Sequence, residues 1–168
     1  QRQELVLQTA AEEEHEEEVL DPNTKTPWER DGKAWHLRER TFPDGRRPVW
    51  DGDAAEWLVD QVSALGELDP ANWNTKNDVR VGFGGVQTQV FLRFNTNEYW
   101  WFRAEFRTKK GLFTHRGINR KLRLPKWNDV KERQVYGSWD RVRIRTYQKN
   151  WDVVQMFLWS RKEIDTPE

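Results

Sequence analysis

The clearest strand pattern in the sequence is YWWFRAEFRT, residues 99–108. Apolar side chains take every second position, namely Trp100, Phe102, Ala104 and Phe106. The positions between them are Tyr99, Trp101, Arg103, Glu105 and Arg107. A period of two is typical of a strand with one buried face and one face toward water. The stretch therefore predicts a sheet with an apolar side and a basic, aromatic side.

The same alternation extends to both sides of this stretch. It predicts strands at 79–83 and 90–94, which are separated by the turn signal Gly84-Gly85, and a further strand at 141–146. In the last of these, Val142 and Ile144 are expected inside, and the residues expected outside are Arg141, Arg143 and Arg145. A short strand at 121–124 brings the expected number to about five.

Two helices are predicted, one on each side of the sheet in sequence. The first begins at Asp51 or Asp53 and ends at Gly66, because Ala54, Trp57, Leu58, Val62 and Leu65 recur at helical spacing. The second begins at Asn150 or Asp152 and would bury Val153, Val154, Phe157 and Leu158. Residues 34–40 are expected to be extended. The expected fold is a single α+β domain with a twisted, mostly antiparallel sheet.

The net charge of zero hides a separation of charge along the chain. Residues 1–31 carry ten acidic and three basic residues, whereas residues 89–149 carry sixteen Lys or Arg and five Asp or Glu. Residues 1–27 therefore read as an acidic flexible linker, and residues 28–168 as a Trp-rich domain. The chain has no cysteine, which excludes disulfides and thiolate metal sites, and no long apolar run, which argues against a membrane-spanning segment.

The strongest functional signal is the basic, aromatic side of the predicted sheet. Arginine donates paired hydrogen bonds to phosphate, and exposed aromatic rings stack on unpaired bases. The sequence predicts DNA, single-stranded or distorted, as the partner of this side. The candidate contacts are Tyr99, Trp101, Arg103, Arg107, Lys109, Lys110, Arg120, Lys121, Arg123, Arg141, Arg143 and Arg145.

Other interpretations stay open. A basic sheet side also forms when arginine stems cover the sheet and their charges meet water, or when a protein partner docks there. Loop tryptophans at 73, 127 and 139 could form a cage for a base or a cation. Enzyme signals are weak: Asp31-Gly32-Lys33 and Asp129-Val130-Lys131 match only a fragment of a metal-dependent nuclease motif, and His15, His36 and His115 are not paired at metal-ligand spacing. No cofactor is expected.

Several stretches together resemble a known extension domain. They are DGKAWH at 31–36, VWDG at 49–52, NWN at 72–74, YGSWDRVRIR at 136–145 and KEIDTP at 162–167. They are similar to a C-terminal extension of long bacterial excinuclease A-like proteins, the ATPases of nucleotide excision repair. The resemblance implies a DNA-repair context, a cytoplasmic location, and the ATPase core or another repair protein as a partner. It carries over no catalytic residue, because no Walker A sequence or zinc-binding cysteine of that family occurs here.

Overall fold

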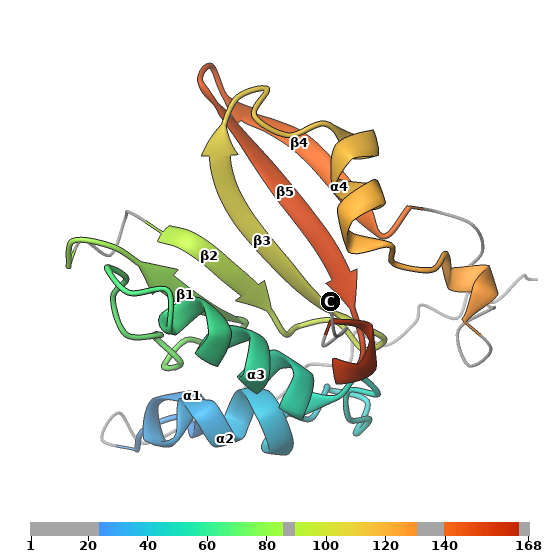
Figure 1. Cartoon of the computed structure of the whole chain (residues 1–168). Coiled ribbons are helices and arrows are strands. Elements are labelled where there is room, and N and C mark those ends of the chain that lie inside the picture. Colours follow the sequence, from blue (N-terminus) through green and yellow to red (C-terminus); the bar gives the residue numbers. More distant parts are fainter. Residues whose placement is uncertain (1–23, 86–89, 131–139, 165–168) are drawn as a thin grey trace, which may run out of the picture.

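The computed structural model describes residues 24–85, 90–130 and 140–164. These residues form one α+β arrangement, a five-stranded antiparallel sheet with helices packed against it (Figure 1). The strands are β1 (Asp78–Gly82), β2 (Val90–Asn95), β3 (Phe102–Lys109), β4 (Val142–Gln148) and β5 (Trp151–Leu158). The fold class predicted from the sequence is confirmed. The middle strand, β3, contains residues 102–108 of the predicted strand; residues 99–101 precede it, and Trp100, expected inside, is exposed. The acidic segment assigned as a linker lies outside the described residues up to position 23.

The strand order is β1-β2-β3-β5-β4, so the chain does not fill the sheet in sequence. The first three strands follow one another as a meander. After β3 the chain passes through α4 (His115–Leu122), enters the edge strand β4, and returns as β5 between β4 and β3. The register places Ala104 opposite Phe94 on one side and opposite Met156 on the other. This pairing brings the apolar positions of neighbouring strands onto one face.

The core lies on that apolar face, under two helices that stand at opposite ends of it. Over β1 to β3 lies α3 (Gly52–Ser63), which buries Ala54, Ala55 and Val59. Over β4 and β5 lies α4, whose Ile118 packs against Val142 and Val154. Phe94 and Phe102 are fully buried between the strands and α3. Each such side chain contributes about 1.5–3 kcal/mol to folding by leaving water.

The helix predicted near residues 51–66 is confirmed as α3. The side chain of Asp51 caps it by accepting from the backbone N–H of Asp53 at 3.0 Å. Gly66 lies beyond its end with φ of 73°. Leu65, expected on the apolar stripe, is 74% exposed because the helix has already ended at Ser63. No described helix combines the length and apolarity needed to cross a membrane.

The prediction of an extended piece at residues 34–40 is wrong. The chain is helical there, as α1 (Pro27–Arg30), α2 (Gly32–Ala34) and the wide turn η1 (Trp35–Glu39). The carboxylate of Asp31 accepts from the N–H of Ala34 at 2.9 Å, which caps α2 and starts the turn. A Cβ at Gly32 would stand 2.2 Å from the carbonyl oxygen of Trp73, so the close contact of this helix with residues 72–74 requires glycine.

The predicted helix after residue 150 is also wrong, since residues 151–158 form β5. In β5, Val154 and Leu158 lie on the core face and Val153 and Phe157 on the open side of the sheet, so its neighbouring apolar pairs imitate helical spacing. The predicted strand at 121–124 is wrong as well, because Thr114 caps α4, which runs to Leu122, by accepting from Gly117 N–H at 3.1 Å. The helix that follows the sheet is the short 3-10 turn η4 (Arg161–Glu163).

Candidate functional site

The second face of the sheet carries the side chains that alternate with the core, and is called the open face below. The register sets Arg93 opposite Glu105, Arg107 opposite Val153, and Arg145 opposite the same Val153. Because α3 and α4 both pack on the apolar face, neither helix covers these residues. The open face is therefore the surface on which the sequence analysis predicts the basic, aromatic site.

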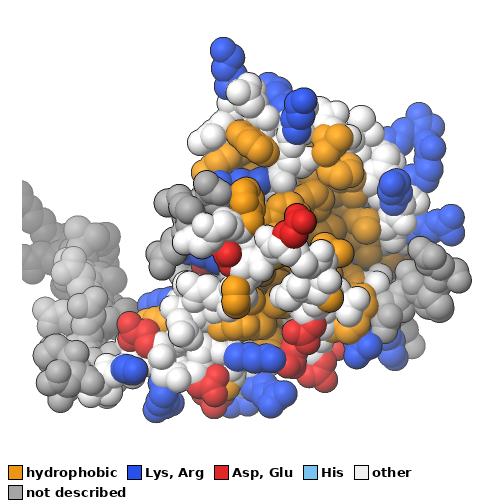
Figure 2. All heavy atoms as spheres, turned by 60° about the vertical axis from the view of Figure 1, so that its left-hand side comes forward, with side chains coloured by type: hydrophobic (Ala, Val, Ile, Leu, Met, Phe, Trp, Pro, Cys, Tyr) orange, Lys and Arg blue, Asp and Glu red, His pale blue; other side chains and the backbone are white. Residues whose placement is uncertain are grey.

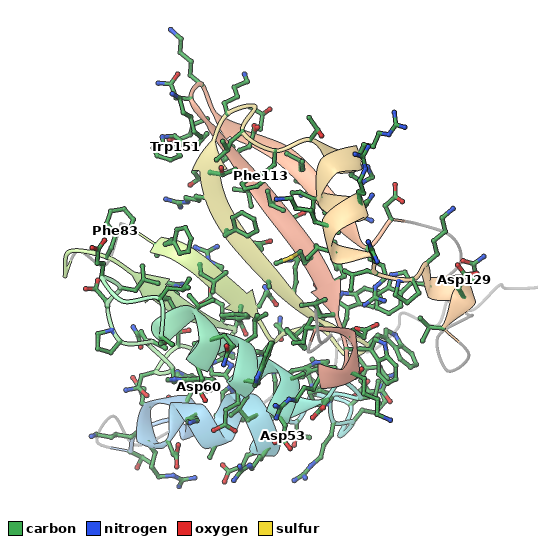
Figure 3. All side chains as sticks on the ribbon, viewed as in Figure 1. Asp53, Asp60, Phe83, Phe113, Asp129 and Trp151 are labelled. Carbon is green, nitrogen blue, oxygen red and sulfur yellow. The ribbon has the colours of Figure 1, made fainter. Side chains whose placement is uncertain are left out.

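One end of the open face is hollowed. Two adjoining cavities of about 250 and 390 Å³ share Val90, Phe91, Arg107 and Tyr147 in their lining, and together are called the aromatic cleft. Phe83, Tyr147 and Trp151 line it and remain 46%, 50% and 46% exposed. Figure 3 shows Phe83 and Trp151 on the same side of the molecule, one after β1 and the other at the start of β5. Aromatic rings from two hairpins thus converge across the sheet.

Arginine lies beside these rings. The guanidinium carbon of Arg107 stands 4.6 Å from the centre of the Tyr147 ring, and its Nη2 lies 3.4 Å from the Tyr147 hydroxyl. Arg145 also lines the cleft, is exposed, and enters no ion pair among the described residues. Stacking on Tyr147 holds the Arg107 charge at the mouth of the cleft.

The same end of the sheet carries further positive charge. Lys109 and Lys110 close β3, and Lys149 lies in the turn between β4 and β5; all three are exposed. The acidic side chain that follows this turn, Asp152 of β5, is buried and accepts from Gly111 N–H at 2.9 Å. In Figure 2, hydrophobic side chains gather in the middle of the molecule, and Lys and Arg side chains stand above and beside them.

The middle of the open face is, by contrast, internally neutralised. Arg103 lies 2.7 Å from Glu105 and 3.4 Å from Glu98, and Arg93 lies 3.0 Å from Asp78. Glu105 also accepts from the side-chain amide of Gln155 at 2.5 Å. The predicted contact Arg103 is therefore engaged within the protein, and the free positive charge lies at the cleft end.

The prediction that Arg141 points to solvent is wrong. Its side chain is 2% exposed, forms an ion pair with Glu163 at 2.6 Å, and donates one hydrogen bond to the same carboxylate at 2.7 Å. The guanidinium lies 4.1 Å from the ring centre of Trp127 and donates to the carbonyl of Phe157. Arg141 follows the strand alternation, but the chain beyond β5 folds over it. The neighbouring Arg143 is half-buried over the ring of Phe157, at 5.1 Å.

The remaining predicted contacts separate into other regions. Tyr99 packs edge-on against Phe42 and under Arg46, away from the cleft. Trp101 packs against Trp127 and Phe157 at the covered end of the open face. The helix α4 and its C-cap, which pack on the apolar face, carry the exposed residues Arg120, Lys121 and Arg123. The structure thus brings Arg107, Arg145, Lys109 and Lys110 together and sets the others apart.

The residues of the other predicted sites, the nuclease-like fragments and the tryptophan cage, have structural roles wherever the structure describes them. Asp31 caps α2, and Lys33 is paired with Glu56 at 2.7 Å. Lys131 and Trp139 lie outside the described residues. Trp127 is fully buried, so it closes the core end and offers no open cage. Within the described ranges, no group of three His, Asp or Glu side chains could hold a metal ion.

His36 is buried and neutral. Its Nδ1 lies 2.5 Å from the Thr96 hydroxyl and its Nε2 lies 2.8 Å from the carbonyl of Thr75, so Nε2 carries the proton and Nδ1 accepts. Burial lowers its pKa from 6.5 to about 4. His115 is half-exposed beside Asp140, at 3.5 Å.

Sequence reasoning missed Phe91, Tyr147 and Trp151, which line the cleft, and Lys149 in the turn between the latter two. The missing step was to read Lys149-Asn150 as a hairpin turn, since Asn is common in turns and residues 151–154 are rich in strand formers. That reading sets Tyr147 and Trp151 near one another across the β4–β5 hairpin, where the register pairs Gln148 with Trp151.

Comparisons with protein-family models, with curated proteins and with solved structures found no match for this chain. Its function is therefore inferred from the chemistry of the aromatic cleft.

Proposed function

We propose that this domain binds single-stranded DNA in the aromatic cleft, as a non-catalytic accessory domain. The observation that carries the proposal is the convergence of Tyr147, Trp151 and Phe83 in one hollow with Arg107 and Arg145. These two arginines form no ion pair with any residue that the structure describes. Proteins that hold single strands combine aromatic stacking platforms with a positively charged groove along the backbone. The aromatic cleft offers both the exposed rings and the positive charge.

The exposed rings favour a single strand over an intact duplex. In a duplex the faces of the bases are stacked on one another, so the rings of Tyr147 and Trp151 have no base to stack on unless the strand is unpaired. Lys109, Lys110 and Lys149 extend the charge past the cleft, where the backbone of a bound strand would continue. A distorted duplex with unpaired bases would satisfy the same contacts.

A DNA-repair setting is part of the proposal and rests on the sequence stretches that resemble the extension of excinuclease A-like ATPases. In that setting the chain is cytoplasmic, the ATPase core or another repair protein is its partner, and the domain supplies an additional contact to DNA. The cleft chemistry stands without this setting, since it depends only on rings and charges.

The test is fluorescence anisotropy of labelled single-stranded and duplex DNA over a series of salt concentrations. Arg145→Gln/Lys149→Gln removes two positive charges at the cleft end, and Arg120→Gln/Lys121→Gln removes two from α4 as the matched control. The cleft variant is expected to lose single-strand affinity and to reduce the magnitude of the salt slope by about 1.4, at roughly 0.7 per phosphate contact. Equal losses in the two variants would contradict the cleft as the binding site.

Stacking is tested separately with Trp151→Ala. Loss of one base–ring contact is expected to raise the Kd of single-stranded DNA roughly 5- to 150-fold, from about 1–3 kcal/mol per base. Leu112→Ala, an exposed apolar residue that does not line the cleft, is the control and should leave the Kd unchanged. An unchanged Kd for Trp151→Ala would remove stacking from the proposal.

A protein-docking role is the second candidate. It is favoured by the same exposed rings beside arginine, because Trp, Tyr and Arg dominate the binding energy of protein interfaces. On this alternative, DNA does not bind at low salt, and Trp151→Ala weakens capture of the ATPase core or of a repair partner. Salt-dependent DNA affinity that is lost in the cleft variant would exclude it as the primary role.

A further inference from the structure

A second feature lies between η1 and the loop that precedes α3, and it shares no lining residue with the aromatic cleft. It is a cavity of about 210 Å³ lined by His36, Arg38, Arg40, Arg47 and Trp50, among others. Among the described residues that line it, three are arginines and none is acidic. Because His36 is buried and neutral, the charge of the lining is carried entirely by the guanidinium groups. We call this feature the arginine pocket.

Arg40 is the unusual residue of the arginine pocket. It is 4% exposed, yet none of the ion pairs among the described residues includes it. Its guanidinium donates only to neutral oxygens: to the Thr96 hydroxyl at 2.8 Å, and to the amide oxygens of Asn77 and Asn97 at 3.0 and 2.7 Å. A buried charge held by neutral groups alone is expensive, and an anion beside it would offset that desolvation.

Arg141, which is also buried, shows how a buried arginine is usually neutralised. Arg141 is equally hidden from water and is matched by the carboxylate of Glu163. At Arg40 no carboxylate among the described residues takes that place, and burial alone lowers its pKa to about 10. The rings of Trp35 and Phe42 flank the guanidinium at 5.5 and 5.9 Å and hold it in position. The charge is therefore fixed beside the cavity with some of its donors unused.

The donor count supports a ligand. A guanidinium has five N–H donors, and the three hydrogen bonds of Arg40 leave two of them without a partner among the described residues. Arg47, which lines the pocket from the following loop, is exposed and enters no ion pair within the described ranges. Two guanidinium groups with free donors thus border one hollow.

From these contacts we propose that the arginine pocket binds a phosphate group between Arg40 and Arg47. Guanidinium matches the tetrahedral oxygens of phosphate by paired hydrogen bonds. The cavity is smaller than the roughly 300–1,000 Å³ of pockets that enclose whole organic ligands. Its occupant is therefore inorganic phosphate or a single phosphate group of a longer molecule, such as the terminal phosphate of an oligonucleotide. The site is independent of the proposed DNA cleft.

The experiment measures the thermal midpoint of unfolding as inorganic phosphate is titrated against sodium chloride at equal ionic strength. Binding to the folded state stabilises it by RT ln(1 + L/Kd), where L is the free phosphate concentration, so the midpoint rises with the logarithm of that concentration once it exceeds the Kd. Arg47→Gln is the main variant, because this side chain is exposed and enters no ion pair within the described ranges. Arg46→Gln is the matched control, since it removes the same charge one residue away and does not line the pocket.

The unmutated protein and Arg46→Gln are expected to show the same phosphate-dependent rise in the thermal midpoint. In Arg47→Gln the apparent phosphate affinity should fall at least tenfold. A phosphate effect equal to that of chloride, or one equal in all three proteins, overturns the proposal. Where the rise depends on Arg47, displacement of phosphate by a 5′-phosphorylated oligonucleotide, but not by its 5′-hydroxyl counterpart, assigns the group to a nucleic-acid end. Lack of displacement assigns it to free phosphate.

Discussion

Replacing Glu163 by alanine tests the buried pair that took Arg141 away from the predicted DNA contacts. The carboxylate forms an ion pair with Arg141 at 2.6 Å and accepts hydrogen bonds from Arg141 at 2.7 Å and from the backbone N–H of Trp159 at 3.1 Å. Its removal leaves the Arg141 charge with 2% side-chain exposure and without an ion-pair partner among the described residues. Breaking a buried pair in this way costs about 3–5 kcal/mol. A domain of this size is stable by only about 5–15 kcal/mol, so the loss is a large fraction of the total.

Urea denaturation followed by tryptophan fluorescence measures this change in the free energy of unfolding. Trp127, which lies under Arg141, is among the reporting side chains. The thermal midpoint should fall by roughly 6–20 °C, at about 2–4 °C per kcal/mol. Lys162→Ala, the exposed neighbour in the same 3-10 turn, is the control and should change stability by less than about 0.5 kcal/mol.

A double variant separates a lost pair from lost packing. Arg141→Met combined with Glu163→Ala removes the uncompensated charge and should be less destabilised than the sum of the two single variants. A loss below about 1 kcal/mol for Glu163→Ala would refute the reasoning, because it would show that water reaches Arg141 in the folded protein.

Two further predictions concern the N-terminal helices. Burial lowers the pKa of His36 from 6.5 to about 4, so between these pH values the unfolded chain binds a proton that the folded chain does not. The free energy of unfolding should therefore fall by up to ~3 kcal/mol as the pH drops from 6.5 to 4. Denaturation curves of His36→Gln should show a shallower fall over the same pH range. Gly32→Ala should destabilise the domain by about 1–3 kcal/mol, because its Cβ meets the Trp73 carbonyl oxygen at 2.2 Å, whereas Gly117→Ala in α4 should lie within about 1 kcal/mol of the parent in the same thermal assay.

The choice between the two faces of each strand is readable from the sequence where one face is buried and the other wet. In β3 the alternation of Phe102 and Ala104 with Arg103 and Glu105 follows directly from the pleat of a strand, and the burial of the first two confirms it. The helix α3 is readable for a similar reason, because one face of it meets the sheet and its N-cap is the side chain of the residue just before it.

The same local reasoning predicted the wrong secondary structure for residues 151–158 and 34–40. In β5, Val153 and Phe157 lie on the open face and Val154 and Leu158 on the core face, so its pattern carries no period of two. The turn η1 is helical because Asp31 caps the preceding α2 and because His36 bonds to Thr75 and Thr96. These two hydrogen bonds of His36 join residues that are 60 and 39 positions apart in the sequence, so no local sequence pattern indicates them.

The sequence by itself determined the fold class, the apolar and basic sides of the sheet, and the presence of arginine and aromatic rings on the latter. Only the tertiary structure decided which arginines are free. Arg141 and Arg143 occupy equivalent positions on one strand face with Arg145, yet the first pairs with Glu163, the second lies over Phe157, and the third lines the cleft. Alternation along a strand sets the direction of a side chain, whereas the segment that folds over it sets its exposure and charge balance.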